Sequence, residues 1–229
     1  MNQIKGVIFD VDGTLVDSND QHAKAFEEAF HSLGFSIAFA KIRPLIGMGS
    51  DKLIPQLTDL RRGDKMFEKI SETKSAIFKQ RYVSTLRMFP GVSELVDKLK
   101  NLNFKLAIAS SASRIDLKML LGVTGLESQF DAILSSDDAI SSKPDADLVL
   151  AAANRLNLAP DELVMIGDTP YDLLAAARSG VRGLGFRCGG WEDFALNRAQ
   201  EIYDGPWDLV DRFGDSDLLG RNSGELHVA

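Results

Sequence analysis

Short apolar runs alternate with longer amphipathic stretches along most of the chain. Runs of this kind, rich in Val, Ile and Leu, are typical of strands that are buried on both faces. They cover residues 7–9, 105–109, 132–134, 163–166 and 181–186. Apolar residues recur at helical spacing over residues 92–102, 113–121, 146–156 and 171–179, and Asn157 and Gly180 follow the last two as stop signals. The alternation predicts an α/β fold with a parallel sheet between two layers of helices.

The interval between the first two predicted strands has a different pattern, because residues 17–87 contain no convincing strand. Ser18 and Gln21 have the spacing of a capping box, and Gly34 would end the helix that follows. The apolar residues on one face of this helix are Ala23, Phe26, Phe30 and Leu33. A second helical pattern covers residues 65–82. We therefore predict a helical cap domain, residues 17–87, inserted on a two-point hinge into a three-layer, Rossmann-like core of residues 1–16 and 88–229.

The tail after Gly205 is rich in Gly and Asp. Its segment Trp207–Val210 is apolar enough to dock on the core. We expect the last dozen residues to be poorly ordered.

Composition limits the possible partners. The 229 residues are 45% hydrophobic, enough to bury a full core, while the formal net charge of -7 argues against a nucleic-acid surface. No apolar run approaches the roughly 18 residues that span a bilayer, and the first residues lack a signal-peptide pattern. Cys188 is the single cysteine, which excludes an intramolecular disulfide. The sequence predicts a cytoplasmic protein that binds neither membrane nor nucleic acid, as a monomer or a homodimer.

The segment from Val7 to Leu15, with the sequence VIFDVDGTL, carries the strongest chemical signal. A predicted strand delivers the carboxylates of Asp10 and Asp12 into a Gly-Thr turn. Ordinary turn chemistry explains an Asp-Gly pair but leaves Asp10 unexplained. The two acids therefore point to a functional site.

Other polar residues follow the remaining strands. In open α/β sheets, ligands bind beyond the carboxyl ends of the strands, so residues at these ends meet at one edge. Ser110 and Ser111 follow the second predicted strand, and Asp168 and Asp172 follow the fourth. Lys143 lies on the connection after the third strand. One edge of the sheet is thus predicted to collect four acids, hydroxyl groups and an ammonium.

This set of side chains suits phosphoryl transfer. Carboxylate and carbonyl oxygens form the hard site that Mg²⁺ prefers, and the ion offsets repulsion between a carboxylate nucleophile and a phosphoryl dianion. Lys143 can neutralise a phosphate oxygen, and Ser110 can donate a hydrogen bond to it. Because phosphoryl transfer depends chiefly on positioning and charge stabilisation, we expect a small phosphorylated metabolite as substrate.

The motifs closely resemble those of the haloacid dehalogenase-like superfamily of aspartate-nucleophile hydrolases. The four matches, in chain order, are Asp10-Val11-Asp12-Gly13-Thr14, Ser110 after an apolar strand, Lys143-Pro144, and Gly167-Asp168 followed by Asp172. The resemblance covers residues 4–187, and the inserted helices resemble the caps of the phosphoglycolate phosphatase and β-phosphoglucomutase-like branch. Where that branch often reads K-P-x-P-D, this chain has KPDAD at residues 143–147.

The resemblance implies a role for each matching residue. Asp10 would attack phosphorus and form an aspartyl-phosphate, while Asp12 would protonate the leaving oxygen and then activate water. Mg²⁺ would be bound by Asp10, by the backbone carbonyl of Asp12 and by Asp168. Asp172 would orient the metal's waters or Lys143. Thr14 and Ser110 would hold the phosphate, with Ser111 as a further substrate-binding candidate.

Three residues of the predicted cap are candidates for substrate binding. The segment Leu45–Lys52 has two glycines before a helix start, so Gly47 and the Lys52 ammonium could face an anion. A plain turn between helices is the alternative. His22 lies one helical turn into the cap and is predicted to face the cleft, although a packed histidine fits the same pattern.

The function predicted from the sequence is magnesium-dependent hydrolysis of small phosphomonoesters. A β-phosphoglucomutase-like mutase would share Asp10 and Asp12, but its cap resembles a different pattern, with Arg and Lys where this chain has Ser50 and Ile46. A true haloacid dehalogenase lacks the second acid of the pair. A catalytically silent anion-binding module is a further alternative, which detectable turnover would exclude. The identity of the phosphorylated metabolite stays open.

Overall fold

The computed structural model describes residues 3–216, and a six-stranded parallel sheet forms its centre. The strands are β1 (Gly6–Phe9), β2 (Lys105–Ala109), β3 (Ala132–Leu134), β4 (Leu163–Gly167), β5 (Arg182–Phe186) and β6 (Glu201–Tyr203). Their order in the sheet is β3-β2-β1-β4-β5-β6. Phe9 is in register with Ile108 of β2 and Ile166 of β4, so the chain leaves the centre of the sheet at Asp10.

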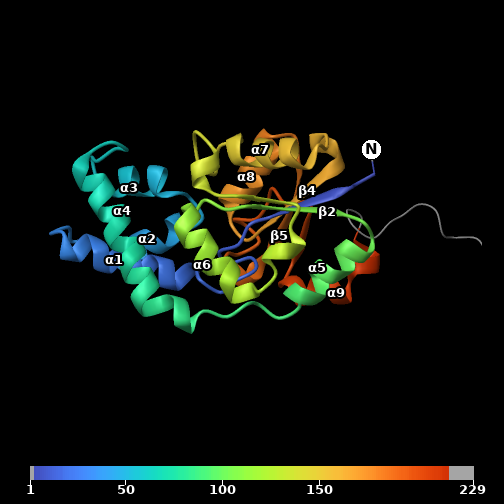
Figure 1. Ribbon diagram of the computed structural model, residues 1–229, viewed down its shortest axis with the longest axis horizontal. Coiled ribbons are helices and arrows are strands. Elements are labelled where there is room, and N and C mark those ends of the chain that lie inside the picture. Colours follow the sequence, from blue (N-terminus) through green and yellow to red (C-terminus); the bar gives the residue numbers. More distant parts are fainter. Residues whose placement is uncertain (1–2, 217–229) are drawn as a thin grey trace, which may run out of the picture.

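Helices cover both faces of the sheet (Figure 1). One layer contains α5 (Val92–Asn101), α6 (Arg114–Thr124) and α9 (Pro206–Asp211), and the other contains α7 (Asp147–Leu156) and α8 (Pro170–Arg178). Alternate residues of β1 belong to separate apolar clusters, Val7 and Phe9 to one and Ile8 to the other. Since successive side chains of a strand point to opposite faces, the sheet separates two cores. The predicted three-layer α/β architecture is confirmed.

A helical insertion, which we define as residues 17–87, lies at one end of the sheet (Figure 1). Its helices are α1 (Asn19–Ser32), α2 (Phe39–Ile42), α3 (Ser50–Leu57) and α4 (Lys65–Ile77), and α4 continues as a π-helical turn over Phe78–Tyr82. Short 3-10 turns cover Arg43–Leu45 and Val83–Thr85. The apolar face predicted for α1 packs in a third cluster within the insertion.

The two segments that join the insertion to the sheet run side by side. Val16 forms an isolated antiparallel bridge with Met88. The amide of Asp17 donates to the Arg87 carbonyl at 3.0 Å, and the amide of Phe89 donates to the Leu15 carbonyl at 2.9 Å. Backbone hydrogen bonds therefore link the two connecting segments to each other.

The capping box predicted at Ser18 is wrong. Ser18 precedes α1 but forms no side-chain hydrogen bond to the helix. Its hydroxyl donates instead to Asp12 Oδ1 at 2.5 Å. The charge-assisted hydrogen bond to Asp12 orients the hydroxyl away from the first amides of α1, from which a capping oxygen would accept.

The structure also extends some predicted elements. Helix α6 runs to Thr124, past the predicted end at Leu121, because its C-cap is Gly125 in the left-handed region at φ +66°. Strand β6 was not predicted, since three residues at a sheet edge leave little periodicity. The final dozen residues, predicted to be poorly ordered, lie outside the described residues. None of the helices within residues 3–216 has the length and apolar character needed to cross a membrane.

The predicted docking of Trp207–Val210 takes the form of α9, whose Leu209 is fully buried in the same cluster as Leu95 of α5. Leu209→Ala should lower the free energy of unfolding by about 2–5 kcal/mol, because it leaves a cavity between these helices. Chemical denaturation monitored by circular dichroism measures the change. Asp211→Ala, at an exposed position of α9, is the matched control and should change stability by less than about 0.5 kcal/mol. Equal losses in both variants would contradict the docking role of Leu209.

Candidate active site

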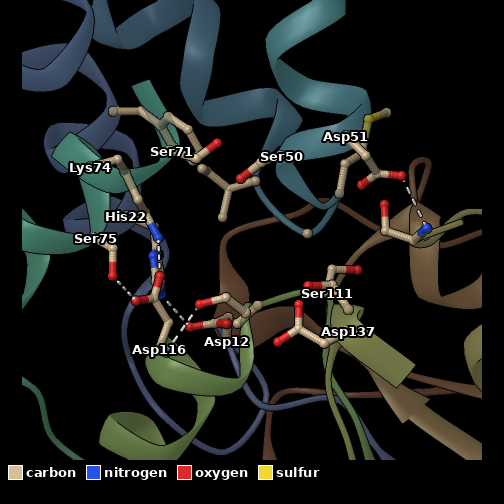
Figure 2. A pocket seen from close by; sticks show the side chains of 18 of the residues that line it. Asp12, His22, Ser50, Asp51, Ser71, Lys74, Ser75, Ser111, Asp116 and Asp137 are labelled. Atoms are coloured by element: carbon tan, nitrogen blue, oxygen red, sulfur yellow. Dashed lines mark hydrogen bonds and ion pairs between the residues drawn. The ribbon is translucent and has the colours of Figure 1, made fainter. Parts of the chain in front are cut away.

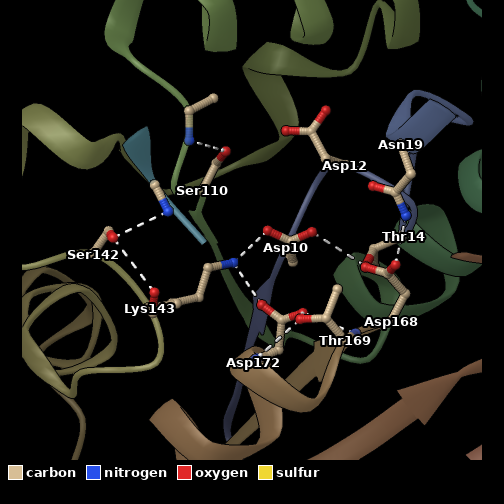
Figure 3. Close-up of polar contacts among 12 residues, drawn as sticks. Asp10, Asp12, Thr14, Asn19, Ser110, Ser142, Lys143, Asp168, Thr169 and Asp172 are labelled. Carbon is tan, nitrogen blue, oxygen red and sulfur yellow. Dashed lines mark hydrogen bonds and ion pairs between the residues drawn. The ribbon is translucent and has the colours of Figure 1, made fainter. Parts of the chain in front are cut away.

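Three carboxylates and one ammonium meet at the carboxyl edge of the sheet (Figure 3). Asp10 follows β1, Asp168 follows β4, and Asp172 lies in the first turn of α8. All three are buried, and each offers an oxygen within 4.8 Å of the other two. The sequence motifs, widely separated along the chain, are thus brought together by the parallel strand order.

Lys143 is the positive centre of this cluster, and its side chain is fully buried. Its Nζ contacts Asp10 Oδ1 and lies 2.6 Å from Asp172 Oδ1. Burial opposes the charged ammonium, but the two carboxylates raise the pKa of Lys143 above its ordinary value. Asp172 is held in turn by Thr169, whose amide and hydroxyl donate to Oδ2 at 3.1 and 2.6 Å. The start of α8 therefore holds the Asp172 carboxylate in position, and Asp172 in turn positions Lys143.

Asp168 occupies a tight polar site beside this pair. It accepts hydrogen bonds from Thr14 Oγ1 at 3.0 Å and from Asn19 Nδ2 at 2.8 Å. Two glycines leave room for its carboxylate: a Cβ on Gly13 would lie 2.3 Å from Asp168 Oδ2, and a Cβ on Gly189 would lie 1.8 Å from the same oxygen. Gly13 also has φ +78°, a conformation that favours glycine.

The cluster carries excess negative charge. Burial raises the pKa of Asp10 well above its ordinary value despite the opposing effect of Lys143. Burial and the nearby Asp172 raise the pKa of Asp168 to about 7. Because one ammonium faces three carboxylates, the site favours a bound cation, and its oxygen-only donor set is the kind that Mg²⁺ prefers.

The carboxylate of Asp12 points away from the three-carboxylate cluster (Figure 3). It lines the neighbouring cavity, where its Oδ1 lies 2.7 Å from His22 Nε2 and accepts the Ser18 hydroxyl. Burial alone would raise the pKa of Asp12, but the contacts with His22 and Ser18 lower it below the ordinary value. The side chains of Asp10 and Asp12 are therefore in different electrostatic environments.

His22 belongs to a buried network that the sequence analysis missed. Its ring stacks on Phe78, with centroids 3.9 Å apart and planes at 14°. Lys74 Nζ lies 5.0 Å from the centre of the same ring and 2.7 Å from Asp116 Oδ2. Burial would raise the pKa of Asp116, but Lys74 and His22 lower it. One feature of the sequence could have indicated this network: Lys74 lies on the same helix face as the apolar residues Phe67 and Ile70, where a buried lysine needs a partner.

A cavity of about 230 Å³ lies between the insertion and the sheet edge (Figure 2). The predicted site residues that line it are Asp10, Asp12, His22, Gly47 and Ser111. Thr14 and Ser110 are buried behind this surface, where Thr14 donates to Asp168 and Ser110 Oγ accepts from the Ala112 amide at 3.1 Å.

The structure does not bring Lys52 to the cavity. Its Nζ lies 2.6 Å from Asp145 Oδ2, in an ion pair between the insertion and the core. The start of α3 also contacts Ser142, the residue before Lys143. The Gly49 amide donates to Ser142 Oγ at 3.0 Å, and the Ser142 amide donates to Asp51 Oδ2 at 3.2 Å. Lys52 thus lies among contacts that hold the insertion against the segment that carries Lys143.

Comparison with known proteins agrees with this geometry. The family model described as haloacid dehalogenase-like hydrolase matches residues 7–186. A protein described as probable phosphatase IndB, from Dickeya dadantii, is 32% identical over 212 residues, which cover 91% of this chain and 90% of that protein. Pyrophosphatase PpaX from Oceanobacillus iheyensis is 29% identical, with coverage of 78% and 81%.

The crystal structure of a hydrolase from Pseudomonas syringae superimposes with a TM-score of 0.87 at 32% identity, covering 93% of this chain and 99% of that one. The family match spans β1 with its two aspartates, Lys143 and the turn after β4. The chain therefore belongs to the haloacid dehalogenase-like hydrolases.

Proposed function

We propose that the protein is a magnesium-dependent phosphatase that hydrolyses small phosphomonoesters through an aspartyl-phosphate on Asp10. The observation that carries the proposal is the contact of Asp10 with the buried Lys143 beside a cavity that the carboxylate of Asp12 also lines. This arrangement supplies a nucleophile and a separate acid on the wall of one cavity, with a fixed positive charge in contact with the nucleophile. The phosphatase name of the relative from Dickeya dadantii gives independent support.

In the first step, a carboxylate oxygen of Asp10 attacks phosphorus, and the bond between phosphorus and the ester oxygen breaks. Lys143 stabilises the negative charge that Asp10 and the phosphoryl group share. Asp12 gives its proton to the leaving oxygen. The dianionic phosphate favours the protonated form of Asp12 when the ester binds, because like charges raise a carboxyl pKa.

In the second step, Asp12 takes a proton from water, and the resulting hydroxide attacks the phosphorus of the aspartyl-phosphate. The bond between phosphorus and the Asp10 oxygen breaks, which releases inorganic phosphate and regenerates both carboxyl groups. The contacts of Asp12 with His22 and Ser18 hold its carboxylate on the cavity side throughout.

The residues fit a magnesium ion. Asp10, Asp168 and Asp172 offer a compact set of oxygen donors. Burial and the nearby Asp172 raise the pKa of Asp168, and a bound cation would oppose both effects. Asp10 and Asp168 would hold the ion directly, with the Asp12 carbonyl as a further ligand. When bound, Mg²⁺ supplies positive charge that reduces repulsion between Asp10 and the phosphoryl group.

The insertion, residues 17–87, is proposed to act as a cap. It supplies one wall of the cavity and meets the core through Gly49, Asp51 and Lys52. The two connecting segments, which are paired at Val16 and Met88, are suited to act as a hinge. Closure would exclude bulk water from the phosphorylated enzyme.

The phosphatase is favoured over a mutase by the walls of the cavity. Ile46 and Ser50, the positions that we compared with the Arg and Lys pattern of the mutase, both line it. Neither side chain carries a charge for a second phosphate group.

Asp10→Asn should abolish turnover of p-nitrophenyl phosphate with Mg²⁺ and leave the circular dichroism spectrum unchanged, because the isosteric amide is not a nucleophile. Asp12→Asn should slow turnover by about 10²–10⁴-fold, as expected for loss of a general acid and base. This second variant should also accumulate a phosphoryl adduct on Asp10, detected by mass spectrometry after rapid quenching. Wild-type turnover by Asp10→Asn without deamidation would rule out the covalent mechanism.

Mg²⁺ should raise the Tm of the metal-free protein at neutral pH, because it relieves repulsion among the buried carboxylates. At about 100 times the Kd, the added free energy of unfolding is about 2.7 kcal/mol. Asp168→Asn should remove most of the Tm shift in differential scanning fluorimetry.

A pH series without metal provides the control for this prediction. Because the folded-state pKa of Asp168 lies above its ordinary value of 3.8, at about 7, the folded chain binds more protons between these values. The stability of the wild type should therefore fall as pH rises through this range, and Asp168→Asn should reduce the slope. An unchanged slope together with an undiminished Mg²⁺ shift would remove Asp168 from the metal site.

Lys52→Ala should lower kcat/KM by no more than about fivefold, and by similar factors for different esters, because a part-exposed ion pair contributes only about 0–1 kcal/mol. Lys143→Ala should impair every ester severely, since it leaves buried carboxylates without their counterion. Steady-state kinetics over a phosphate-ester panel tests both. A changed ranking of substrates in Lys52→Ala would show that Lys52 contacts the substrate.

A further inference from the structure

We propose that the cavity selects phosphomonoesters whose remaining part is small, uncharged and rich in hydroxyl groups, as in sugar and polyol monophosphates. Esters with a second negative charge should be disfavoured. This inference rests on the proposed phosphatase function, because it concerns the walls around the same two aspartates. It goes further by assigning the selection to particular side chains.

Besides Asp10, Asp12 and Asp116, which is paired with Lys74, three carboxylates line the cavity. They are Asp51 on α3, Glu68 on α4 and Asp137 after β3. Each carboxylate accepts one hydrogen bond from a backbone amide. Asp51 accepts from Ser142 at 3.2 Å, Glu68 from Gly63 at 3.2 Å, and Asp137 from Arg114 at 3.1 Å. In the described part of the chain, none of the three forms an ion pair. Each of these carboxyl groups has lone pairs free to accept further hydrogen bonds.

The basic residues of the cavity offer less positive charge. Lys74 is paired with Asp116, and His22 lies against Asp12. Arg62, on the exposed segment between α3 and α4, is the remaining basic lining residue, and within residues 3–216 it forms no ion pair. Three unpaired carboxylates thus outnumber one guanidinium, and Arg62, Glu68 and Asp137 are all exposed while Asp51 is half-buried. A second anionic group on the substrate would therefore meet net repulsion.

Hydroxyl groups on the walls point to the same class of substrate. Ser71 Oγ and Ser111 Oγ are shielded from solvent and have no hydrogen-bond partner among the described residues. Buried polar atoms are normally paired, and serine can both donate and accept. Figure 2 shows Ser50, Asp51 and Ser71 on the insertion side and Ser111 and Asp137 on the core side.

Substrate hydroxyl groups match both kinds of wall group, because they donate to carboxylates and exchange hydrogen bonds with serines. Phe67 and Ile46 add apolar surface that suits the C–H groups of a carbohydrate. The volume of about 230 Å³ lies below the roughly 300–1,000 Å³ of pockets for drug-sized ligands, which favours a small substrate.

The test compares glycerol 3-phosphate with 3-phosphoglycerate, which differ by a hydroxymethyl group in place of a carboxylate. With Mg²⁺ present, kcat/KM should be at least about tenfold higher for glycerol 3-phosphate. Ribose 5-phosphate should be hydrolysed well, and pyrophosphate poorly. The preference should decrease as ionic strength rises, because salt screens the repulsion.

Glu68→Gln and Asp137→Asn retain an acceptor oxygen and the side-chain shape while removing one charge. Each should narrow the preference for glycerol 3-phosphate about three- to tenfold by raising kcat/KM for 3-phosphoglycerate. Glu72→Gln is the matched control, because Glu72 is exposed on the same helix and does not line the cavity. It should leave the preference unchanged.

Hydrolysis of 3-phosphoglycerate as fast as glycerol 3-phosphate would overturn the inference. The inference would also be overturned if 3-phosphoglycerate were hydrolysed faster than glycerol 3-phosphate and Arg62→Gln abolished that difference. Arg62 would then bind the second anionic group. If no ester, including p-nitrophenyl phosphate, is hydrolysed, the proposed function fails. Calorimetric binding of the two glycerol derivatives to the Asp10→Asn variant then decides the inference separately: tighter binding of glycerol 3-phosphate supports it, and equal binding overturns it.

Discussion

The contact of the buried Lys143 ammonium with Asp10 and Asp172 is the interaction on which the site depends. It brings together the end of β1, the connection after β3 and the first turn of α8. Removing the ammonium would leave buried carboxylates without their counterion, which costs several kcal/mol. The fold can hold these groups because the parallel strands end at one edge and the cap of α8 satisfies the second oxygen of Asp172.

The same cluster is unfavourable in the free protein. Three buried carboxylates share one lysine, and burial together with the neighbouring carboxylates raises the pKa values of Asp10 and Asp168. In the proposed mechanism, this excess negative charge favours the entry of a cation, whose positive charge would reduce the repulsion between Asp10 and the phosphoryl group. Cation binding and the stability of the folded protein are therefore coupled, because both depend on the same carboxylate oxygens.

Much of the fold and of the charged cluster could be predicted from the sequence. Five strands and the motif residues follow from apolar runs that end in acids, because parallel strands bring such ends together. The pairs that depend on the insertion could not be predicted. Lys74 pairs with Asp116, and Lys52 pairs with Asp145, across 42 and 93 positions of the chain, and no local pattern encodes either choice. Ser18 has the spacing of a helix cap, yet its hydroxyl donates a hydrogen bond to the carboxylate of Asp12.

The close approach of Gly189 to Asp168 has a consequence for the tolerance of this enzyme to mutation. Gly189 takes no part in the chemistry and lies outside the four motifs, yet a single methyl group there would occupy the position of the Asp168 carboxylate. Its replacement is constrained as tightly as that of the aspartate itself. Directed evolution that protects only the polar residues would therefore inactivate the enzyme through a position that has no side chain.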